Sequence, residues 1–497
     1  MNTLRDFETL PAGAEPMNTC HEHEGVFNGK SVRYQARLET YEIVGNGDGD
    51  ESARAFIVAT SYCAIAMGGA VVDAARRPVT FVFNGGPIVP SAFLQMLAFA
   101  PQRLDVDADP QYGEDEAPLV GNRDAVLDVT DIVLFDPPGT GFSTVADDTD
   151  ERAFHSVNAD AHAFSTFVRA WCARHGRLDA PIFVFGSSYG TIRAAAAAPK
   201  IAVGDEALRL DGIYLLGQAV NIVETVNRPE NLMSYVVTLP TLAALGAYHR
   251  RSVEMDTPME LLMEKATRFA ETSYLNALLK GQSISKDELQ SVAQGLCELT
   301  GLSAQAFIDR RLKIGKVLFR ELLLADQGLV IGGLDGRYVS VGDVHRPTRD
   351  ISHVLDAPIQ RAHREHLKGI VGVDPMERYN YQSPVKSLDD WRWGAATPFS
   401  DWRYGQSIAD AMAANPALRL TIGVGYHDTF TTYGASRYAI KQSDWPLERV
   451  SFRAYYGGHM PYALQESLRS IMSDFRALVA GGRELATAPN QPENIHG

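Results

Sequence analysis

The chain has 497 residues, of which 45% are hydrophobic and 22% are charged, and its formal net charge is −15. This length exceeds what one simple core usually supports, so we expect a core with a sizeable insertion. An acidic surface disfavours nucleic acid and anionic membranes as partners. No apolar stretch is long enough to span a bilayer, and the first ten residues lack the features of a secretory signal.

Residues 25–220 alternate strand-like runs with helical segments. The first two runs, 31–43 and 53–67, indicate a hairpin around the glycine-rich turn 45–50. The later runs are short and almost wholly apolar, as expected of strands buried on both faces of a mainly parallel sheet. These predicted strands are 78–83, 131–135, 181–185 and 212–216.

Amphipathic helices dominate residues 221–400. A proline at position 258 precedes the predicted helix 259–280, and the capping box 285–288 opens a second helix. Strand character returns at 418–423 and 450–455, and 461–480 reads as a closing helix. We therefore predict an α/β fold with a flexible N-terminus (1–24), a core in two parts (25–220 and 401–497) and a helical insertion between them (221–400).

The most informative motif is Gly-Ser-Ser-Tyr-Gly at 186–190, between the strand 181–185 and an alanine-rich helix. This is the pattern of a nucleophile elbow, whose central serine, here Ser188, sits on a strained strand-to-helix turn. Helix placement also directs backbone N–H groups toward the reacting centre.

A serine nucleophile needs a base and an orienting acid, which in this type of sheet follow in the chain order Ser, acid, His. Asp428 follows the strand 418–423, and His459 follows the strand 450–455, directly after two glycines. They are our predicted acid and base. His427, adjacent to Asp428, is the rival base.

The oxyanion of an acyl-transfer reaction needs two converging backbone N–H groups. One comes from the residue after the nucleophile, here Tyr189, and the other from a loop after an earlier strand. The Asn-Gly-Gly-Pro loop 84–87 follows the strand 78–83 and fits that place through Gly86. A second loop, 136–143, is expected to wall the site without a chemical role.

Four segments, taken in order, resemble the serine carboxypeptidase family of α/β-hydrolases: 84–87, 136–143, 188–191 and 457–460. Segments 426–428 and 333–337 are similar to its bacterial branch. The resemblance extends over nearly the whole chain from about residue 25. It implies an α/β-hydrolase fold, Ser188 with Asp428 and His459 as a triad, Gly86 and Tyr189 as the oxyanion hole, and an insertion that caps the site.

Three departures from the family pattern concern substrate recognition. Ser187 stands where the family typically has glutamate, Ile88 and Val89 follow the loop proline, and an acid is absent from 97–101. In the peptidases, the resemblance implies, such acids grip the substrate's terminal carboxylate and favour work at acidic pH. Our candidate substrate-binding residues are Asn84, Gly85, Ser187, Ile88 and Val89.

Three functions remain open on these residues. The favoured one is hydrolysis of an ester or amide of a non-peptide or unusual acyl substrate, with acyl transfer as a variant. The second is a carboxypeptidase, and the third is a binding protein on a retired hydrolase scaffold.

No cofactor or metal is expected. Cys20-His-Glu-His23 lacks completing ligands, and His363 and His366 are predicted to be solvated. The scattered cysteines Cys20, Cys63, Cys172 and Cys297 indicate reduced thiols and a cytoplasmic location. The expected partner is a small-molecule or short-peptide substrate, with neither nucleic acid nor membrane. The sequence does not determine the oligomeric state and leaves a homo-oligomer open.

Overall fold

The computed structural model describes residues 16–106, 117–341, 353–374, 378–394 and 399–481. Within these residues an 11-stranded sheet runs through the molecule in the order β1-β2-β3-β8-β5-β10-β11-β14-β15, with β4 and β9 paired to β3. Its strands are β1 (Asn18–Phe27), β2 (Lys30–Val44), β3 (Arg54–Met67), β4 (Ala70–Val71), β5 (Val79–Phe83), β8 (Asp131–Leu134), β9 (Thr144–Val145), β10 (Ile182–Ser187), β11 (Leu210–Leu216), β14 (Arg419–Gly425) and β15 (Val450–Tyr455). The two-stranded pairs are β6 (Gln102–Leu104) with β7 (Leu119–Gly121), and β12 (Leu329–Ile331) with β13 (Val339–Val341).

The six strands from β8 to β15 in this order are mutually parallel, whereas β1, β2 and β3 are antiparallel to their neighbours. A mainly parallel sheet whose connections pass through helices must bury both of its faces. The predicted fold class is confirmed: this is an α/β-hydrolase fold.

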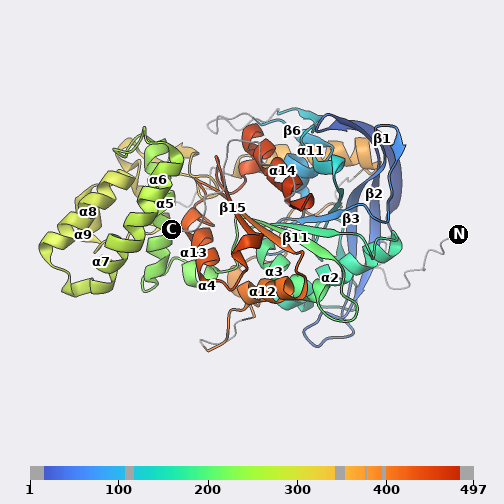
Figure 1. Cartoon of the computed structure of the whole chain (residues 1–497), viewed down its shortest axis with the longest axis horizontal. Coiled ribbons are helices and arrows are strands. Elements are labelled where there is room, and N and C mark those ends of the chain that lie inside the picture. Colours follow the sequence, from blue (N-terminus) through green and yellow to red (C-terminus); the bar gives the residue numbers. More distant parts are fainter. Residues whose placement is uncertain (1–15, 107–116, 342–352, 375–377, 395–398, 482–497) are drawn as a thin grey trace.

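Side chains of the central strands alternate between two hydrophobic clusters. In β10, Ile182 and Val184 belong to one cluster, and Phe183 and Phe185 to the other, as the two-residue period of a strand requires. Helices α2, α3 and α12 cover the first face, while α11 and α14 cover the second (Figure 1). The helices are α1 (Ala92–Leu94), α2 (Val157–Arg174), α3 (Gly190–Ala202), α4 (Ile222–Thr225), α5 (Leu232–Tyr248), α6 (Met259–Phe269), α7 (Leu275–Lys280), α8 (Lys286–Thr300), α9 (Ala304–Asp309), α10 (Lys316–Leu322), α11 (Asp356–His366), α12 (Tyr404–Ala414), α13 (Tyr433–Gln442) and α14 (Gln465–Val479).

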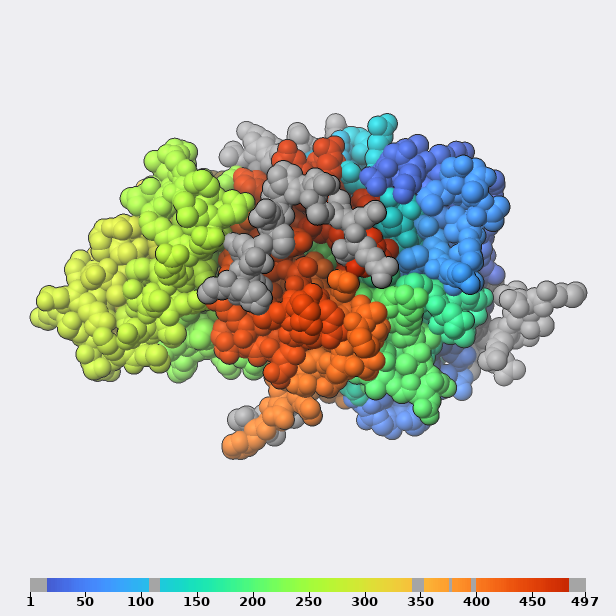
Figure 2. Space-filling view, viewed as in Figure 1, coloured from blue at the N-terminus to red at the C-terminus, as the bar shows by residue number. Residues whose placement is uncertain are grey.

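Helices α5 to α10 form a lobe beside the sheet with a hydrophobic cluster of their own. In the space-filling view this lobe, coloured green to yellow, projects from one side of the body (Figure 2). Val424 of β14 and Tyr433 of α13 belong to the same cluster, so the lobe is packed onto the sheet.

Two sequence expectations need correction. Residues 18–24 are not a flexible terminus, because they lie in β1, which pairs with β2 along its whole length; residues 1–15 lie outside the described part. β1 has few apolar residues and is held by backbone hydrogen bonds to its neighbour, which its composition does not reveal. The predicted helix 259–280 is interrupted by a π-helical turn, η4 (Ala270–Tyr274), between α6 and α7.

Candidate active site

Ser188 lies at the sharp turn between β10 and α3. Its φ is +59°, a left-handed conformation that side-chain-bearing residues rarely adopt, and its N–H donates to the Leu216 carbonyl at 2.9 Å. Any Cβ on Gly186 would lie 2.7 Å from the Gly190 carbonyl oxygen. The local sequence therefore forces the serine into the strained, half-buried position of a nucleophile elbow.

Asp428 and His459 come from the loops after β14 and β15, which are neighbouring parallel strands. His459 Nδ1 lies 2.7 Å from Asp428 Oδ2, and Asp428 has no exposed surface. The carboxylate also accepts hydrogen bonds from the N–H groups of Phe430 and Thr431 and from the Thr431 hydroxyl, at 2.5–3.0 Å. These donors fix the carboxylate so that it can hold one imidazole orientation and stabilise the charged ring.

Ser188 and His459 both lie near the carboxyl end of β11. Leu216 accepts the Ser188 N–H, and a Cβ on the next residue, Gly217, would lie 3.2 Å from His459 Cε1. In the described structure no hydrogen bond joins Ser188 Oγ to His459. Such catalytic hydrogen bonds are often long in ligand-free enzymes and tighten when substrate binds.

The loop 84–87 lies directly against the elbow. A Cβ on Gly85 would be 2.6 Å from the Tyr189 nitrogen and 2.7 Å from Ser188 Cβ, so this approach requires glycine. Gly86 is exposed and has a φ of +115°. The N–H groups of Gly86 and Tyr189 donate to no described residue, which leaves both able to bind an oxyanion.

The candidate substrate-binding residues differ in accessibility. Ile88 has no exposed surface and packs with Tyr189 and Trp391 in a hydrophobic cluster, so it anchors the loop; it does not face solvent. Ser187 is also buried, at the end of β10, while Val89 is half-buried. Asn84 uses its Oδ1 to accept the Leu94 N–H at 3.1 Å. Among these candidate residues, Val89 has an apolar side chain that is partly exposed and can contact a substrate.

A buried ion pair that the sequence analysis missed supports the loop 84–87. Arg193 Nε donates to both Asp160 oxygens at 2.8–2.9 Å, and neither side chain is exposed. Arg193 Nη1 donates to the Asn84 carbonyl at 3.0 Å, and the Tyr189 hydroxyl donates to Asp160 at 2.9 Å. The pair therefore connects the two segments that are predicted to form an oxyanion hole to α2 and α3. The sequence did contain one indication of this pair, because a single arginine interrupts the apolar and alanine-rich start of α3.

The loop 136–143 is held by a second buried acid. Asp136 accepts hydrogen bonds from the N–H and hydroxyl of Ser91 and from the Tyr379 hydroxyl, at 2.6–2.8 Å. Burial raises the pKa of Asp136, against the opposing effect of these donors. The contacts make it a structural residue that joins three segments of the chain.

His427, the rival base, is fully buried, and its ring nitrogens hydrogen-bond to no described residue. Its ring lies between those of Tyr248 and Tyr456, with centroid separations of 5.4 and 5.1 Å. This position favours His459 as the partner of Asp428.

The expectation that His363 and His366 are solvated is wrong. Both are fully buried where α11 packs on the sheet. His363 Nε2 lies 2.9 Å from Gln95 Oε1, and His366 Nε2 lies 2.6 Å from the Tyr62 hydroxyl. Their polar partners are far away in sequence, so the local pattern could not reveal burial.

Among the described residues no group of three His, Cys, Asp or Glu side chains could hold a metal ion.

These buried histidines predict a loss of stability in acid. Burial lowers the pKa of His366 to about 3 and those of His363 and His427 well below the usual value. Below about pH 6.5 the unfolded chain takes up protons that the folded chain does not. The free energy of unfolding should therefore fall by roughly 1.4 kcal/mol per pH unit for each such histidine.

Urea unfolding between pH 7.5 and 5 measures this slope. His366→Gln should reduce it, whereas His21→Gln, at an exposed position, should leave it unchanged. Equal slopes in wild type and His366→Gln would contradict the assignment.

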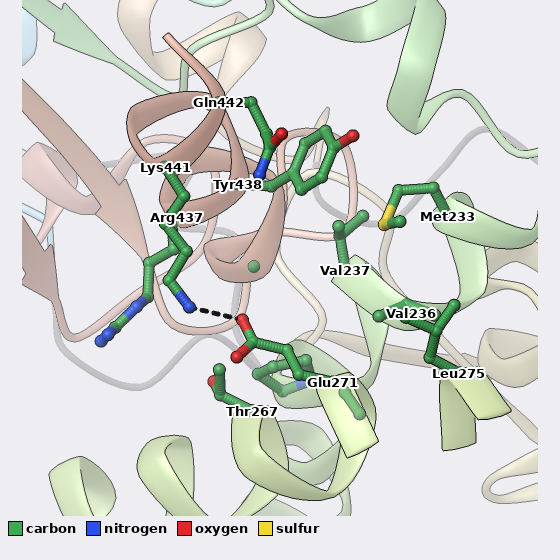
Figure 3. A pocket seen from close by; sticks show the side chains of 13 residues that line it. Met233, Val236, Val237, Thr267, Glu271, Leu275, Arg437, Tyr438, Lys441 and Gln442 are labelled. Carbon is green, nitrogen blue, oxygen red and sulfur yellow. Dashed lines mark hydrogen bonds and ion pairs between the residues drawn. The ribbon is translucent and has the colours of Figure 1, made fainter. Parts of the chain in front are cut away.

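A surface pocket of about 320 Å³ lies between α5, η4, α7 and α13 (Figure 3). Its wall is mainly apolar, and Lys441 donates to Glu271 across it at 2.6 Å. None of the predicted site residues lines it, so it is separate from the candidate active site.

No protein-family model and no curated protein sequence matches the chain. Solved structures similar to it include a lipase in its open form (13% identity, TM-score 0.34, 90% of this chain and 100% of that one). Others are a peroxisomal α/β-hydrolase from Saccharomyces cerevisiae (11%, 0.35, 92% and 93%) and a rice cell wall degrading esterase from Xanthomonas oryzae (11%, 0.37, 94% and 98%). Within the described residues no helix is long and apolar enough to cross a membrane. By the strand order and connections of its own sheet, the chain is an α/β-hydrolase in fold.

Proposed function

We propose that this chain is a serine hydrolase that cleaves an ester or amide bond of a non-peptide or unusual acyl substrate. One observation carries the proposal: the buried Asp428 lies 2.7 Å from His459 at the carboxyl ends of the parallel strands, where the strained Ser188 also lies. Nucleophile, base and orienting acid in this relation form the arrangement that activates a serine for acyl transfer.

The proposed mechanism proceeds in two acyl-transfer steps that share the same residues. Ser188 Oγ attacks the acyl carbon while its proton passes to His459 Nε2. The Gly86 and Tyr189 N–H groups stabilise the oxyanion. His459 then protonates the leaving group, and an acyl-serine ester remains. Water, activated by the same imidazole, attacks this ester and regenerates Ser188.

The region beside the loop 84–87 indicates the substrate class. Ser187 is neutral and buried, and Val89 offers apolar surface where the peptidases of the resembled family bind a carboxylate. The buried histidines also disfavour the acidic pH at which a carboxylic-acid grip works. We further propose that the lobe formed by helices α5 to α10, within the predicted insertion 221–400, is a cap that shapes the substrate pocket.

Intact-mass analysis after treatment with a fluorophosphonate at pH 5 and pH 8 tests the proposal. We expect a single adduct in the wild type, formed faster at pH 8 because general-base catalysis by an imidazole needs its neutral form, and none in Ser188→Ala. Absence of an adduct at either pH would reject the serine mechanism. A labelled enzyme that cleaves peptides with free C-termini best, near pH 5, would instead be a carboxypeptidase.

A further inference from the structure

Residues 333–337, between β12 and β13, form a short segment of the predicted insertion, which we call the bridging segment. It reaches the loop 426–432, which carries Asp428 and is called the acid loop, and the loop 456–460, which carries His459 and is called the base loop. Its two ends hold the acid loop: the Thr429 hydroxyl donates to the Gly333 carbonyl at 2.6 Å, and the Gly336 N–H donates to the His427 carbonyl at 3.1 Å. These contacts flank Asp428 on its N- and C-terminal sides.

The middle of the bridging segment holds the base loop. The His459 N–H donates to the Leu334 carbonyl at 2.6 Å, and the Gly458 N–H donates to Asp335 Oδ2 at 3.0 Å. A Cβ on Gly458 would lie 2.4 Å from the Asp335 Cα, so the two backbones are in contact. Two successive amides of the base loop, including that of His459 itself, are thus fixed from outside the loop.

Asp335 is in turn fixed by Arg337. The guanidinium donates to both carboxylate oxygens, through Nε at 3.0 and 3.2 Å and through Nη2 at 2.6 Å, in the bidentate form that sets direction as well as distance. Both residues are largely buried, and the Arg337 guanidinium lies over the Tyr456 ring at 5.1 Å. A charged acceptor locked in this way holds the Gly458 amide more firmly than a solvated one.

The lobe adds support to the same region. His249, directly after α5, bonds through Nε2 to the Gly336 carbonyl at 2.7 Å, and Lys316 of α10 donates to the Phe430 carbonyl at 2.6 Å. The helices of the insertion are therefore connected to the acid and base loops by hydrogen bonds as well as by apolar packing.

We propose that Asp335 is a positioning residue, which sets the distance and angle between His459 and Asp428 and couples the helical insertion to them. This inference rests on the proposed function. Misplacement of a catalytic group by about 1 Å can cost on the order of a hundredfold in rate. We therefore expect Asp335→Asn to slow fluorophosphonate acylation of Ser188 roughly 10- to 100-fold at pH 8.

The experiment compares wild type, Asp335→Asn and the matched control Asp326→Asn. Asp326 pairs with Arg251 at the exposed surface of the insertion and touches neither loop. The acylation rate is measured together with thermal unfolding and with the far-downfield proton NMR signal of the His459 Nδ1–H. In Asp335→Asn we expect a slower reaction and a shifted or lost signal in a folded protein, with both unchanged in the control.

A folded Asp335→Asn that reacts at the wild-type rate, or one that reacts slowly with an unchanged histidine signal, would overturn the inference. If Asp335→Asn does not fold, Arg337→Lys decides by the same criteria, because it keeps the positive charge but removes the bidentate contact that fixes the Asp335 carboxylate. If the wild type itself is not acylated, the proposed function fails. That outcome differs from failure of the Asp335 inference, in which the wild type is acylated normally.

Discussion

Replacing Asp428 by asparagine is expected to lower the rate of Ser188 acylation about 10⁴-fold at neutral pH. The amide is close in shape to the carboxylate, and its oxygen can still accept the N–H groups of Phe430 and Thr431. Its nitrogen, however, donates to His459 Nδ1 and places the imidazole proton on Nε2. In that tautomer Nε2 cannot accept the serine proton.

Stopped-flow or intact-mass measurement of fluorophosphonate acylation tests this expectation. The control is Asp410→Asn, an exposed acid on α12 whose carboxylate accepts only a neighbouring glutamine in the described structure. Thermal unfolding should show that Asp428→Asn remains folded. A folded Asp428→Asn that reacts within tenfold of wild type would remove Asp428 from the mechanism.

Replacing Asp160 by alanine is expected to reduce the free energy of unfolding by about 3–5 kcal/mol, because it leaves the Arg193 charge buried without its partner. Arg193 has no exposed surface, and its Nη2 already has no described hydrogen-bond partner. The same change removes the acceptor of the Tyr189 hydroxyl. The oxyanion hole should therefore loosen, and acylation should slow as well.

Urea unfolding at pH 7 measures this effect. The double variant Asp160→Leu with Arg193→Met should regain much of the stability, since well-packed apolar residues often replace a buried pair without loss. Its acylation should stay slow, because the Asn84 carbonyl has lost its donor. Asp326→Asn, which breaks an exposed pair, should cost less than about 1 kcal/mol. A loss below that value in Asp160→Ala would show that the pair is not essential to the core.

The strands of the central sheet and the sharp turn at 186–190 could be predicted from the sequence alone. Short apolar runs such as 131–135 and 181–185 predict buried strands because a strand buried on both faces has no polar side to display. The elbow is equally local, since two glycines and a serine within five residues permit one sharp turn. The positions of Asp428 and His459 after the last strands could also be predicted. Parallel strands place their carboxyl ends on the same side of the sheet, so residues that follow neighbouring strands lie close together.

What only the tertiary structure decided are the contacts between distant segments. β1 carries few apolar residues, and its strand conformation depends on the backbone of β2. His363 and His366 look solvated in a polar stretch, yet their partners Gln95 and Tyr62 lie more than 250 residues away. The same holds for Asp335, which is 123 residues from Gly458. The local hydrophobic pattern of a sequence predicts which apolar residues are buried. The pairing of buried polar groups depends instead on which distant segments the folded chain brings together.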